Sequence, residues 1–400
     1  MRMRMLLSAL AAETQELDLL FFVSRDQYLE GDALARFESK LNAQWGLRAN
    51  LILCAFANRV PPGKTLRQQI APILDARNQK RFAHNCGHEC VGALEACLER
   101  KPDLIFFHRL HSMVPLFSVR RALPPVVLDF DDVEHWTELR RIRTFRLSQT
   151  PSYLLRLPAL HLLERKAIRL ARATFVCSER DRRYLTFWLR LPRVEVFPNA
   201  VDFPQVQTAS TPTLAVGYIG RYSYRPNIKA AEELIDDIWP LVRAKLPEAK
   251  LLLAGALPER IPLFRRVQAY QLEGRKRFAG IEFTGFVPEV DQFYERVQVV
   301  CCPIRSGGGT RIKIIEAAAH GVPVVATRLA AEGLDFTDGD EIVLAESPEA
   351  IAQACVALLS DPDRCRAIGT AAREKAAARY QLKNVIASVR KRLRSIAEIS

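Results

Sequence analysis

The chain has 400 residues, of which 49% are hydrophobic and 26% charged, with 18 Gly and 23 Pro. This composition is that of a folded globular protein, and it excludes a disordered chain or a collagen-like repeat. A single hydrophobic core stops growing at about 250–300 residues, so we expect two domains. No uncharged apolar run reaches the length of about 18 residues that a membrane-spanning helix needs.

The charge of the chain favours anionic partners. Its 58 basic and 45 acidic residues give a net charge of +13, which suits nucleic acid, acidic lipid headgroups or phosphorylated substrates. No recognised nucleic-acid module or array of stacking aromatic residues appears, so we predict no nucleic-acid partner. Part of the excess lies in three groups, each either a solvated face or a docking surface for anionic membranes: Arg140, Arg141, Arg143 and Arg146; Arg180, Arg182 and Arg183; and Arg390, Lys391, Arg392 and Arg394.

The nine cysteines are an odd number and several lie in apolar runs, where a reduced thiol behaves as a small hydrophobe. This usage predicts a reducing, cytoplasmic location. The segment HNCGHEC superficially resembles a metal site, but its alternating His84, Cys86, His88 and Cys90 lack the C-x2-C and H-x3-H pairs of zinc modules. We therefore predict no metal ion there.

The first half of the chain predicts a doubly wound α/β domain over residues 1–205. Its apolar runs do not alternate with polar residues, and helical stretches such as 31–46 and 155–172 lie between them, as in a parallel sheet covered on both faces. Such a domain normally opens with a strand and a Gly-rich turn, whereas this chain opens with a helix, so the pattern favours a first domain without its leading strand. The expected strands lie within 17–23, 49–56, 103–108, 125–132, 173–178 and 194–202.

A Pro/Ser/Thr/Gln-rich stretch at 203–213 predicts a linker, after which strands and helices alternate again. We expect a second Rossmann-like domain over 206–382 and a final helix, 383–400, that packs back toward the first domain. Helices are predicted at 227–245 and 310–320, and Ser347 with Pro348 predicts a helix start. The expected strands lie within 214–220, 250–256, 281–287, 297–304, 322–327 and 341–345.

The most informative segment is a glycine-rich loop, Ser306–Gly309, between the strand at 297–304 and the helix that follows. Glycines let backbone N–H groups approach a ligand, and the helix N-terminus attracts anions, so the loop predicts an anion site with Thr310 as helix cap. Arg311 and Lys313 stand in the first turn, where cations are unfavourable unless an anionic ligand offsets them. The alternative is a glycine-rich helix start with solvated charges.

Ligand contacts are also predicted at Glu316 and at the pair Gly220 and Arg221. Glu316 lies farther along the same helix, where a carboxylate can accept hydrogen bonds from two ribose hydroxyls. Gly220 and Arg221 end the first strand of the second domain, a ligand position in open sheets, and Arg221 can bind a phosphate bidentately. As an isolated residue, Arg221 is equally well a surface arginine.

Taken together, these motifs resemble the retaining family 4 glycosyltransferases of the GT-B fold, in which two Rossmann-like domains face a cleft. The matching segments are GYIGR (217–221), LLLAG (251–255), IEFTGFVPE (281–289) and GGGTRIKIIEAAAHGVPVVAT (307–327). PNAVD (198–202) and CSERD (177–181) resemble further family motifs at the end of the first domain.

The resemblance implies that a nucleotide-diphosphate sugar is the donor substrate and that no other cofactor is needed. Arg221 and Lys313 would bind the diphosphate, Glu316 the ribose, and the backbone near Gly255 and Phe286–Val287 the base. The positive charges of Arg221 and Lys313 would replace a metal ion in stabilising the leaving phosphate. The implied binding set is completed by Gly220, Asn227, Gly307, Gly308, Gly309, Thr310 and Arg311.

Two departures from the family pattern leave the donor sugar open. The family has two glutamates separated by seven residues; Glu316 matches the second, and Gly308 stands at the first. The lysine that usually follows the Gly-Arg pair is absent, because YRPN (224–227) stands there. Arg225 and Lys229 are the alternative substitutes.

In the first half, His108 and His111 follow one expected strand, and Asp129, Asp131 and Asp132 follow the next. A histidine near this place contacts the donor sugar in related enzymes, so His111 or His108 is the candidate, with a structural role as the alternative. For the aspartates the alternative is capping of the next helix. We expect Arg221, Lys313, Glu316 and His111 to be the catalytic residues.

The resemblance implies a cytoplasmic enzyme of cell-surface polysaccharide synthesis that transfers sugar, with retention, to a glycan or lipid-linked acceptor. It would contact anionic membranes peripherally. The alternatives are a GT-B epimerase of sugar nucleotides and an inactive partner subunit that binds a donor.

Overall fold

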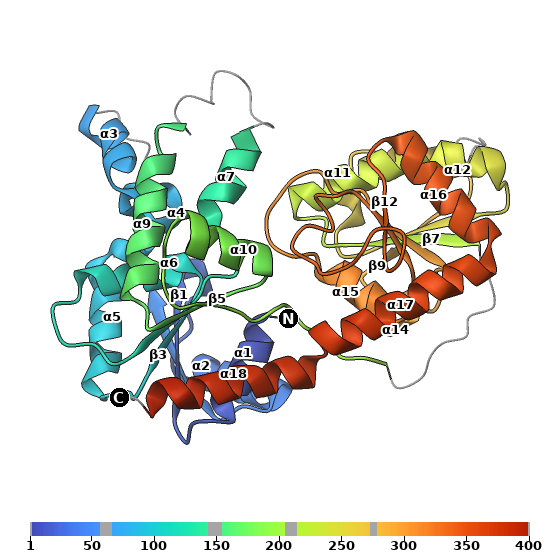
Figure 1. Ribbon diagram of the computed structural model, residues 1–400. Coiled ribbons are helices and arrows are strands. Elements are labelled where there is room, and N and C mark those ends of the chain that lie inside the picture. The colour runs from blue at the N-terminus through green and yellow to red at the C-terminus, as the bar shows by residue number, and fades with distance from the viewer. Residues whose placement is uncertain (1, 57–65, 143–153, 205–213, 273–277, 399–400) are drawn as a thin grey trace. The chain divides into compact units, whose positions relative to one another are not determined.

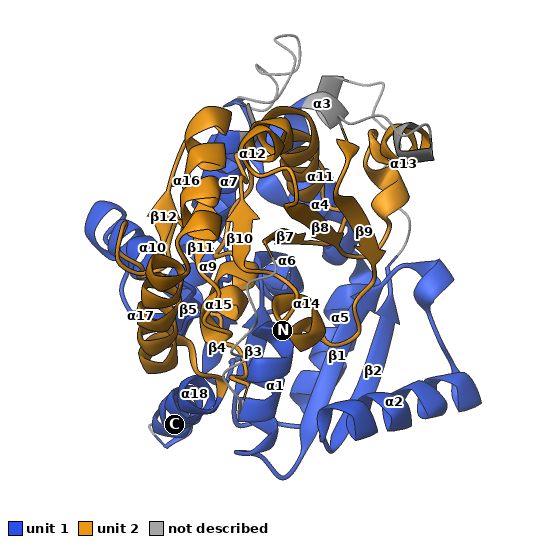
Figure 2. Ribbon diagram, turned by 90° about the vertical axis from the view of Figure 1, so that its right-hand side faces the viewer, with its two compact units in different colours: residues 1–198, 383–400 blue, residues 199–382 orange. Residues whose placement is uncertain are grey.

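The computed structural model describes residues 2–56, 66–142, 154–204, 214–272 and 278–398 (Figure 1). The chain forms two compact units, with residues 1–198 and 383–400 in unit 1 and residues 199–382 in unit 2 (Figure 2). Most of the expected linker, 205–213, lies outside the described residues, as do Arg143 and Arg146. No helix in the described ranges is long and apolar enough to cross a membrane.

Unit 1 contains two parallel sheets. Every apolar run predicted as a strand contains one. The first sheet pairs β1 (Leu17–Val23) with β2 (Ala49–Ala55). The second has the order β3-β4-β5-β6 and consists of β3 (Ile105–His108), β4 (Val126–Asp129), β5 (Ala173–Val176) and β6 (Val194–Val196).

Helices cover the sheets of unit 1. Helices α1 (Arg2–Ala11) and α2 (Gly31–Trp45) belong to the first sheet, where Leu7, Leu19 and Leu51 share one apolar cluster. A π-helical turn, Tyr184–Trp188, extends α10 (Glu179–Arg183) toward β6. The remaining helices are α3 (Leu66–Leu74), α4 (Lys80–Ala83), α5 (His88–Glu99), α6 (Leu110–Met113), α7 (Glu134–Ile142), α9 (Leu157–Leu170), α10 (Glu179–Arg183) and α18 (Leu382–Ala397).

Helix α18 joins unit 1 through ion pairs. Arg390 and Arg394 both bind Glu13, and Arg392 binds Glu195 at 2.7 Å. Three of the four basic residues grouped at 390–394 therefore have carboxylate partners within the unit.

Unit 2 is one six-stranded parallel sheet with the order β12-β11-β10-β7-β8-β9. The chain passes from β7 to β8 and β9 on one side, then returns to β10 on the other side of β7. The neighbouring carboxyl ends of β7 and β10 are therefore the topological switch point, where open α/β sheets bind ligands. The strands are β7 (Ala215–Ile219), β8 (Lys250–Ala254), β9 (Ile281–Gly285), β10 (Val299–Cys302), β11 (Val324–Ala326) and β12 (Val343–Leu344).

Helices lie on both faces of this sheet (Figure 1), so the doubly wound architecture expected from the sequence is confirmed for unit 2. The predicted helix 227–245 is interrupted by a π-helical turn, Leu234–Ile238, just before Pro240, which has no N–H to donate. Ser347 caps α16 by accepting the Ala350 N–H at 3.1 Å, as predicted. The helices are α11 (Arg225–Glu233), α12 (Trp239–Lys245), α13 (Phe264–Leu272), α14 (Val290–Tyr294), α15 (Ile312–Ala319), α16 (Pro348–Ser360) and α17 (Pro362–Tyr380).

Candidate donor-binding site

The loops after β7 and β10 approach each other closely at the switch point of unit 2. A Cβ added to Gly220 would lie 2.9 Å from the Lys313 Nζ and from the Asn227 amide, so a larger residue would displace these side chains. A Cβ on Gly307 would lie 2.5 Å from the Tyr224 Oη. The two predicted glycine positions therefore bring the two loops together.

Gly255, at the end of β8, packs directly on the loop after β7. Its φ is +136°, and an added Cβ would lie 1.8 Å from the Gly220 carbonyl oxygen. An L side chain is strained at this φ and has no room there. Gly255 thus fixes the shape of the Gly220 loop, whatever it contributes to a ligand.

Asn227 forms hydrogen bonds with three groups around the loop after β7. Its Oδ1 accepts hydrogen bonds from the Tyr218 Oη at 2.9 Å and the Lys313 Nζ at 3.1 Å. Its Nδ2 donates to the Arg221 carbonyl oxygen at 3.0 Å. Because its amide is so engaged, we assign Asn227 to positioning Lys313 and the Arg221 backbone.

Lys313 extends from α15 toward the switch point. Its Nζ lies 4.0 Å from the centroid of the Tyr218 ring. Burial lowers the pKa of Lys313 to about 8, and no carboxylate pairs with its ammonium among the described residues. A buried cation without a counter-ion is the feature expected of a phosphate site.

Arg221 lies in the loop after β7 and is exposed. Its carbonyl oxygen is fixed by Asn227 and by the Tyr224 N–H at 3.2 Å. Within the described ranges its guanidinium has no hydrogen-bond or ion-pair partner. The side chain is available for an anionic ligand.

The glycine-rich loop is organised around Arg311. The guanidinium donates to the carbonyl oxygens of Ser306 at 3.4 Å, Gly307 at 3.2 Å and Gly308 at 2.5 Å, and also to that of Gly309. These carbonyls offset the Arg311 charge, so Arg311 needs no anionic ligand in this turn. For Lys313 the need for an anionic ligand stays a prediction.

The backbone amides of the same loop remain available. In the part of the chain that the structure describes, the N–H groups of Gly307, Gly308 and Gly309 have no acceptor. Gly307 and Gly309 have φ values of +98° and +70°, conformations that glycine adopts at little cost. With the N-terminus of α15 next to them, these amides can receive phosphate oxygens.

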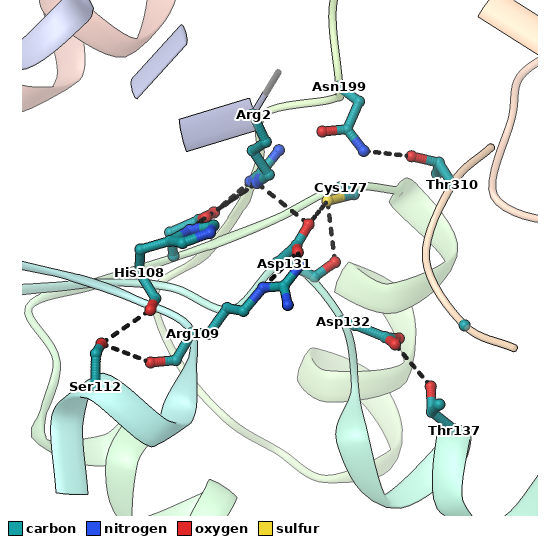
Figure 3. A network of polar contacts seen from close by, with 12 residues as sticks. Arg2, His108, Arg109, Ser112, Asp131, Asp132, Thr137, Cys177, Asn199 and Thr310 are labelled. Carbon is teal, nitrogen blue, oxygen red and sulfur yellow. Dashed lines mark hydrogen bonds and ion pairs between the residues drawn. The ribbon is translucent and has the colours of Figure 1, made fainter. Parts of the chain in front are cut away.

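Thr310 does not cap α15, contrary to expectation. The N-cap residue is Arg311, without a side-chain cap. The Thr310 Oγ1 instead accepts a hydrogen bond from the Asn199 Nδ2 at 2.8 Å (Figure 3). Asn199 belongs to the PNAVD motif, and its buried Oδ1 has no partner in the described residues. This long-range pair could not be read from the spacing of the motifs.

Glu316 is oriented by a residue that the sequence analysis missed. The Tyr294 Oη donates to the Glu316 Oε2 at 3.1 Å, and Tyr294 stacks on His320 with ring centroids 4.5 Å apart. Burial raises the pKa of Glu316 even though Tyr294 opposes the shift. Tyr294 lies in α14, outside any glycine motif, so only the tertiary structure identifies it.

The predicted base-binding positions continue along the same sheet edge. Gly255 follows β8, and its N–H donates to the Gly285 carbonyl oxygen at 2.7 Å. Phe286 follows β9 and is 72% exposed, whereas Val287 is half-buried. From β10 through β7 and β8 to β9, the carboxyl edge thus offers backbone amides, two cations and an exposed aromatic side chain in sequence.

In unit 1, the carboxyl ends of β3 and β4 hold a buried polar network (Figure 3). Arg2 of α1 donates from Nε to the Asp129 carboxylate at 2.9 and 3.0 Å, and from Nη1 to the Phe197 carbonyl oxygen at 2.8 Å. The His108 Nδ1 lies 2.7 Å from the Asp129 Oδ2. Burial alone would raise the pKa of Asp129, but Arg2 and His108 outweigh it and lower that pKa.

The other predicted side chains of this edge have different surroundings. Asp131 accepts hydrogen bonds from Arg109 at 2.6 and 2.9 Å, and Asp132 accepts one from Thr137 at 2.8 Å. His111 lies on α6, where burial and then the Arg109 cation lower its pKa to about 4 and keep it neutral. Of the two histidines, His108 is the one held by a carboxylate, and no local motif distinguishes it from His111.

One group of possible metal ligands exists among the described residues. His135, His161 and Glu164 have ligand atoms within 4.8 Å of one another. However, the His135 Nδ1 contacts Glu164 and its Nε2 lies 2.7 Å from the Tyr184 Oη. Both ring nitrogens are therefore engaged in hydrogen bonds. The HNCGHEC segment is not such a group, and its Cys86 and Cys90 contact main-chain carbonyl oxygens.

Solved structures share this fold. Sucrose-phosphate synthase from Thermosynechococcus elongatus superimposes with a TM-score of 0.65 at 18% identity, covering 97% of this chain and 100% of that one. Anabaena HepE in complex with UDP gives a TM-score of 0.62 at 15% identity, covering 98% and 96%. Staphylococcus aureus TarM gives 0.58 at 16% identity, covering 76% and 59%. The fold is thus the GT-B fold of glycosyltransferases, with two Rossmann-like units.

The match at the level of sequence is confined to unit 2. Residues 213–361 match the family model described as glycosyl transferases group 1. This segment contains the switch-point loops, Lys313 and Glu316. No curated protein matches the chain.

Proposed function

We propose that this protein is a retaining glycosyltransferase that uses a nucleotide-diphosphate sugar. The observation that carries the proposal is the buried Lys313 ammonium at the switch point. Among the described residues it has no carboxylate partner, and the backbone amides of the glycine-rich loop have no acceptor. The family match over 213–361 supports the same reaction class.

In this proposal the donor lies along the carboxyl edge of the unit 2 sheet. Its diphosphate binds Arg221, Lys313 and the amides of Gly307–Gly309, and Glu316 accepts hydrogen bonds from the ribose hydroxyls. The base lies toward Gly255 and Phe286–Val287. Structural neighbours have been solved with UDP, with UDP-glucose, and with UDP and glucose, which supports UDP as the first nucleotide to test.

Catalysis would be mainly electrostatic. The bond between the sugar and the diphosphate breaks as the acceptor hydroxyl forms a new bond on the same face, and the leaving phosphate takes the acceptor proton. Lys313, Arg221 and the helix N-terminus stabilise the charge that develops on the leaving group. This arrangement requires neither a protein nucleophile nor a metal ion.

The first unit supplies the acceptor side and a histidine for the donor sugar. His108 has its Nδ1 toward Asp129, which leaves Nε2 free to bond a sugar hydroxyl. His111, which stays neutral, is the alternative. We further propose a glycan or lipid-linked acceptor in cell-surface polysaccharide synthesis and a cytoplasmic location at the membrane. TarM was solved with a glycerol glycoside and UDP, which supports a sugar-bearing acceptor.

A donor screen with product analysis tests the proposal. Nucleotide sugars with different bases are first ranked by the rise in melting temperature, since a ligand of the folded state stabilises it by mass action. Each stabilising donor is then incubated with glycan acceptors, and the anomer of the product is determined by NMR. An epimerised sugar nucleotide, or stabilisation without transfer to any acceptor, would replace the proposal by an epimerase or a donor-binding subunit.

A further inference from the structure

The positive charge of the chain belongs to one unit. Unit 1 has 36 Lys and Arg against 22 Asp and Glu, a net charge of +14, whereas unit 2 has 22 against 23, a net charge of −1. The phosphate-binding candidate lies in the unit without excess charge. Donor binding therefore does not account for the basic character of the protein.

Much of the excess lies at the amino edge of the sheet β3-β4-β5-β6, opposite the edge that carries Asp129 and His108. The segments that enter these strands, 100–104, 119–125, 169–172 and 189–193, contain eight basic residues and one acidic residue, Asp103. All eight are exposed. We call them the basic edge: Arg100, Lys101, Arg120, Arg121, Arg169, Arg172, Arg190 and Arg193.

The basic edge is not neutralised from within the protein. Arg100 pairs with Asp18 at 2.7 Å. Across the described ranges, the other seven residues have no carboxylate partner. This differs from α18, where Arg390, Arg392 and Arg394 are bound to glutamates. Seven unpaired cations at one edge repel one another, so the edge is suited to an anionic partner.

Three residues of the basic edge occupy left-handed backbone conformations. Lys101, Arg190 and Arg193 have φ values of +53°, +51° and +59°. Glycine or asparagine adopts this conformation more cheaply than a long side chain does. Long cations stand at these turns despite the backbone cost, which indicates that their charge is used.

An exposed aromatic pair lies just before Arg190 in the chain. Phe187 and Trp188 are 75% and 73% exposed, and their rings meet edge to face at 5.6 Å. They end the helical segment that returns from the carboxyl end of β5 to the amino end of β6. Leu170, also exposed, lines one depression together with Arg172 and Arg193. Apolar and basic side chains therefore share this edge.

We propose that the amino edge of the unit 1 sheet docks on a bilayer containing anionic phospholipids. The arginines would lie over the lipid phosphates while Phe187 and Trp188 enter the headgroup layer, where amphipathic aromatic rings are favourable. A nucleic acid is the less suitable partner, because these two rings pack against each other instead of presenting a row of open faces. The proposal goes beyond sugar transfer and does not depend on it.

Flotation of the full-length protein with vesicles tests the docking surface. We expect flotation with phosphatidylcholine vesicles that contain phosphatidylglycerol at low ionic strength, a decrease at high ionic strength, and none with phosphatidylcholine alone. The double variant Arg120→Glu/Arg121→Glu should lower vesicle partitioning by about tenfold or more. Phe187→Ser/Trp188→Ser should lower it while retaining the salt dependence.

The matched control is Lys245→Glu/Lys250→Glu, which reverses two exposed charges near the amino edge of the unit 2 sheet and should leave flotation unchanged. Far-ultraviolet circular dichroism shows whether each variant is folded. Equal flotation of wild type and the Arg120/Arg121 variant would overturn the proposal. So would binding to single-stranded DNA without flotation, which would assign the edge to nucleic acid. Neither result would affect the donor-site assignment.

Discussion

A buried cation lies at the carboxyl edge of a sheet in each unit, and the two cations differ in whether the protein supplies a counter-charge. In unit 1, Arg2 is paired with Asp129, which also holds His108, so its charge is satisfied within the protein. In unit 2, the Lys313 ammonium forms a hydrogen bond with an amide oxygen and lies over an aromatic ring, and it has no carboxylate partner among the residues that the structure describes. The comparison teaches that a buried cation indicates a ligand site when its counter-charge is missing, and a structural role when a carboxylate already supplies it.

Asp129→Asn tests the structural role of the Arg2–Asp129 pair, and we expect it to have the largest effect on stability. The substitution removes the main counter-ion of the buried Arg2 and leaves only Asp131, whose Oδ1 lies 3.6 Å from the Arg2 Nε. Breaking a buried pair costs about 3–5 kcal/mol, and because Asp131 remains we expect a loss of about 3 kcal/mol. Urea denaturation followed by a probe in unit 1 measures the loss. Arg366→Ala, which removes an exposed pair with Asp363, is the control and should change stability by about 0.5 kcal/mol or less. Equal stability of the two variants would refute the contrast.

Lys313→Ala tests the assignment of Lys313 to a ligand site. Removing a preorganised charge from the leaving phosphate lowers kcat by about 10²–10³-fold, and removing an unpaired buried cation should not destabilise unit 2. Turnover of the best donor and the melting temperature without donor are the measurements. Lys245→Ala, on the exposed end of α12, is the control. Turnover at the wild-type rate in the Lys313 variant would show that the site is wrongly assigned.

Glu316→Gln should have a smaller effect, on donor affinity. An amide offers one acceptor oxygen without charge, so we expect about a tenfold rise in the Kd of the donor. The matched probe is the 2′-deoxynucleotide form of the same donor, which lacks one ribose hydroxyl. The variant should discriminate less between the two donors than the wild type does. Unchanged discrimination would remove Glu316 from the ribose site.

The smallest expected effect is the pH dependence of donor binding. Burial lowers the pKa of Lys313 to about 8 despite the nearby Glu316 and Cys302, while Arg311 acts with burial. A bound diphosphate favours the ammonium and raises that pKa, so donor affinity should be flat below pH 8 and fall above it, by at most about tenfold per pH unit. Calorimetric titration of UDP between pH 7 and about 9.5 measures this dependence. An affinity that does not fall above pH 8 in the wild type would contradict the assignment.

The sequence predicted unit 2 better than unit 1 for a physical reason. Gly255 is required by the close approach of the Gly220 backbone, and Gly220 and Gly307 lie close to the side chains of Lys313, Asn227 and Tyr224. Such requirements appear as local motifs next to apolar strands. The Arg2–Asp129–His108 network joins residues more than a hundred positions apart in the chain, so no local pattern reveals it. The predicted cap at Thr310 is wrong because a threonine before a helix is usually a cap, whereas here Asn199 binds it.

The short strands of unit 1 determine how far the carboxyl edge of the sheet would lie from a membrane at its amino edge. Strands β3, β4 and β5 have four residues each, so at about 3.3 Å per residue the two edges of this sheet are about 13 Å apart before the loops are added. With the basic edge resting on lipid headgroups, His108 and Asp129 would stand at least that far above the bilayer. An acceptor anchored in the membrane would then present a sugar distant from its lipid, at the growing end of a chain.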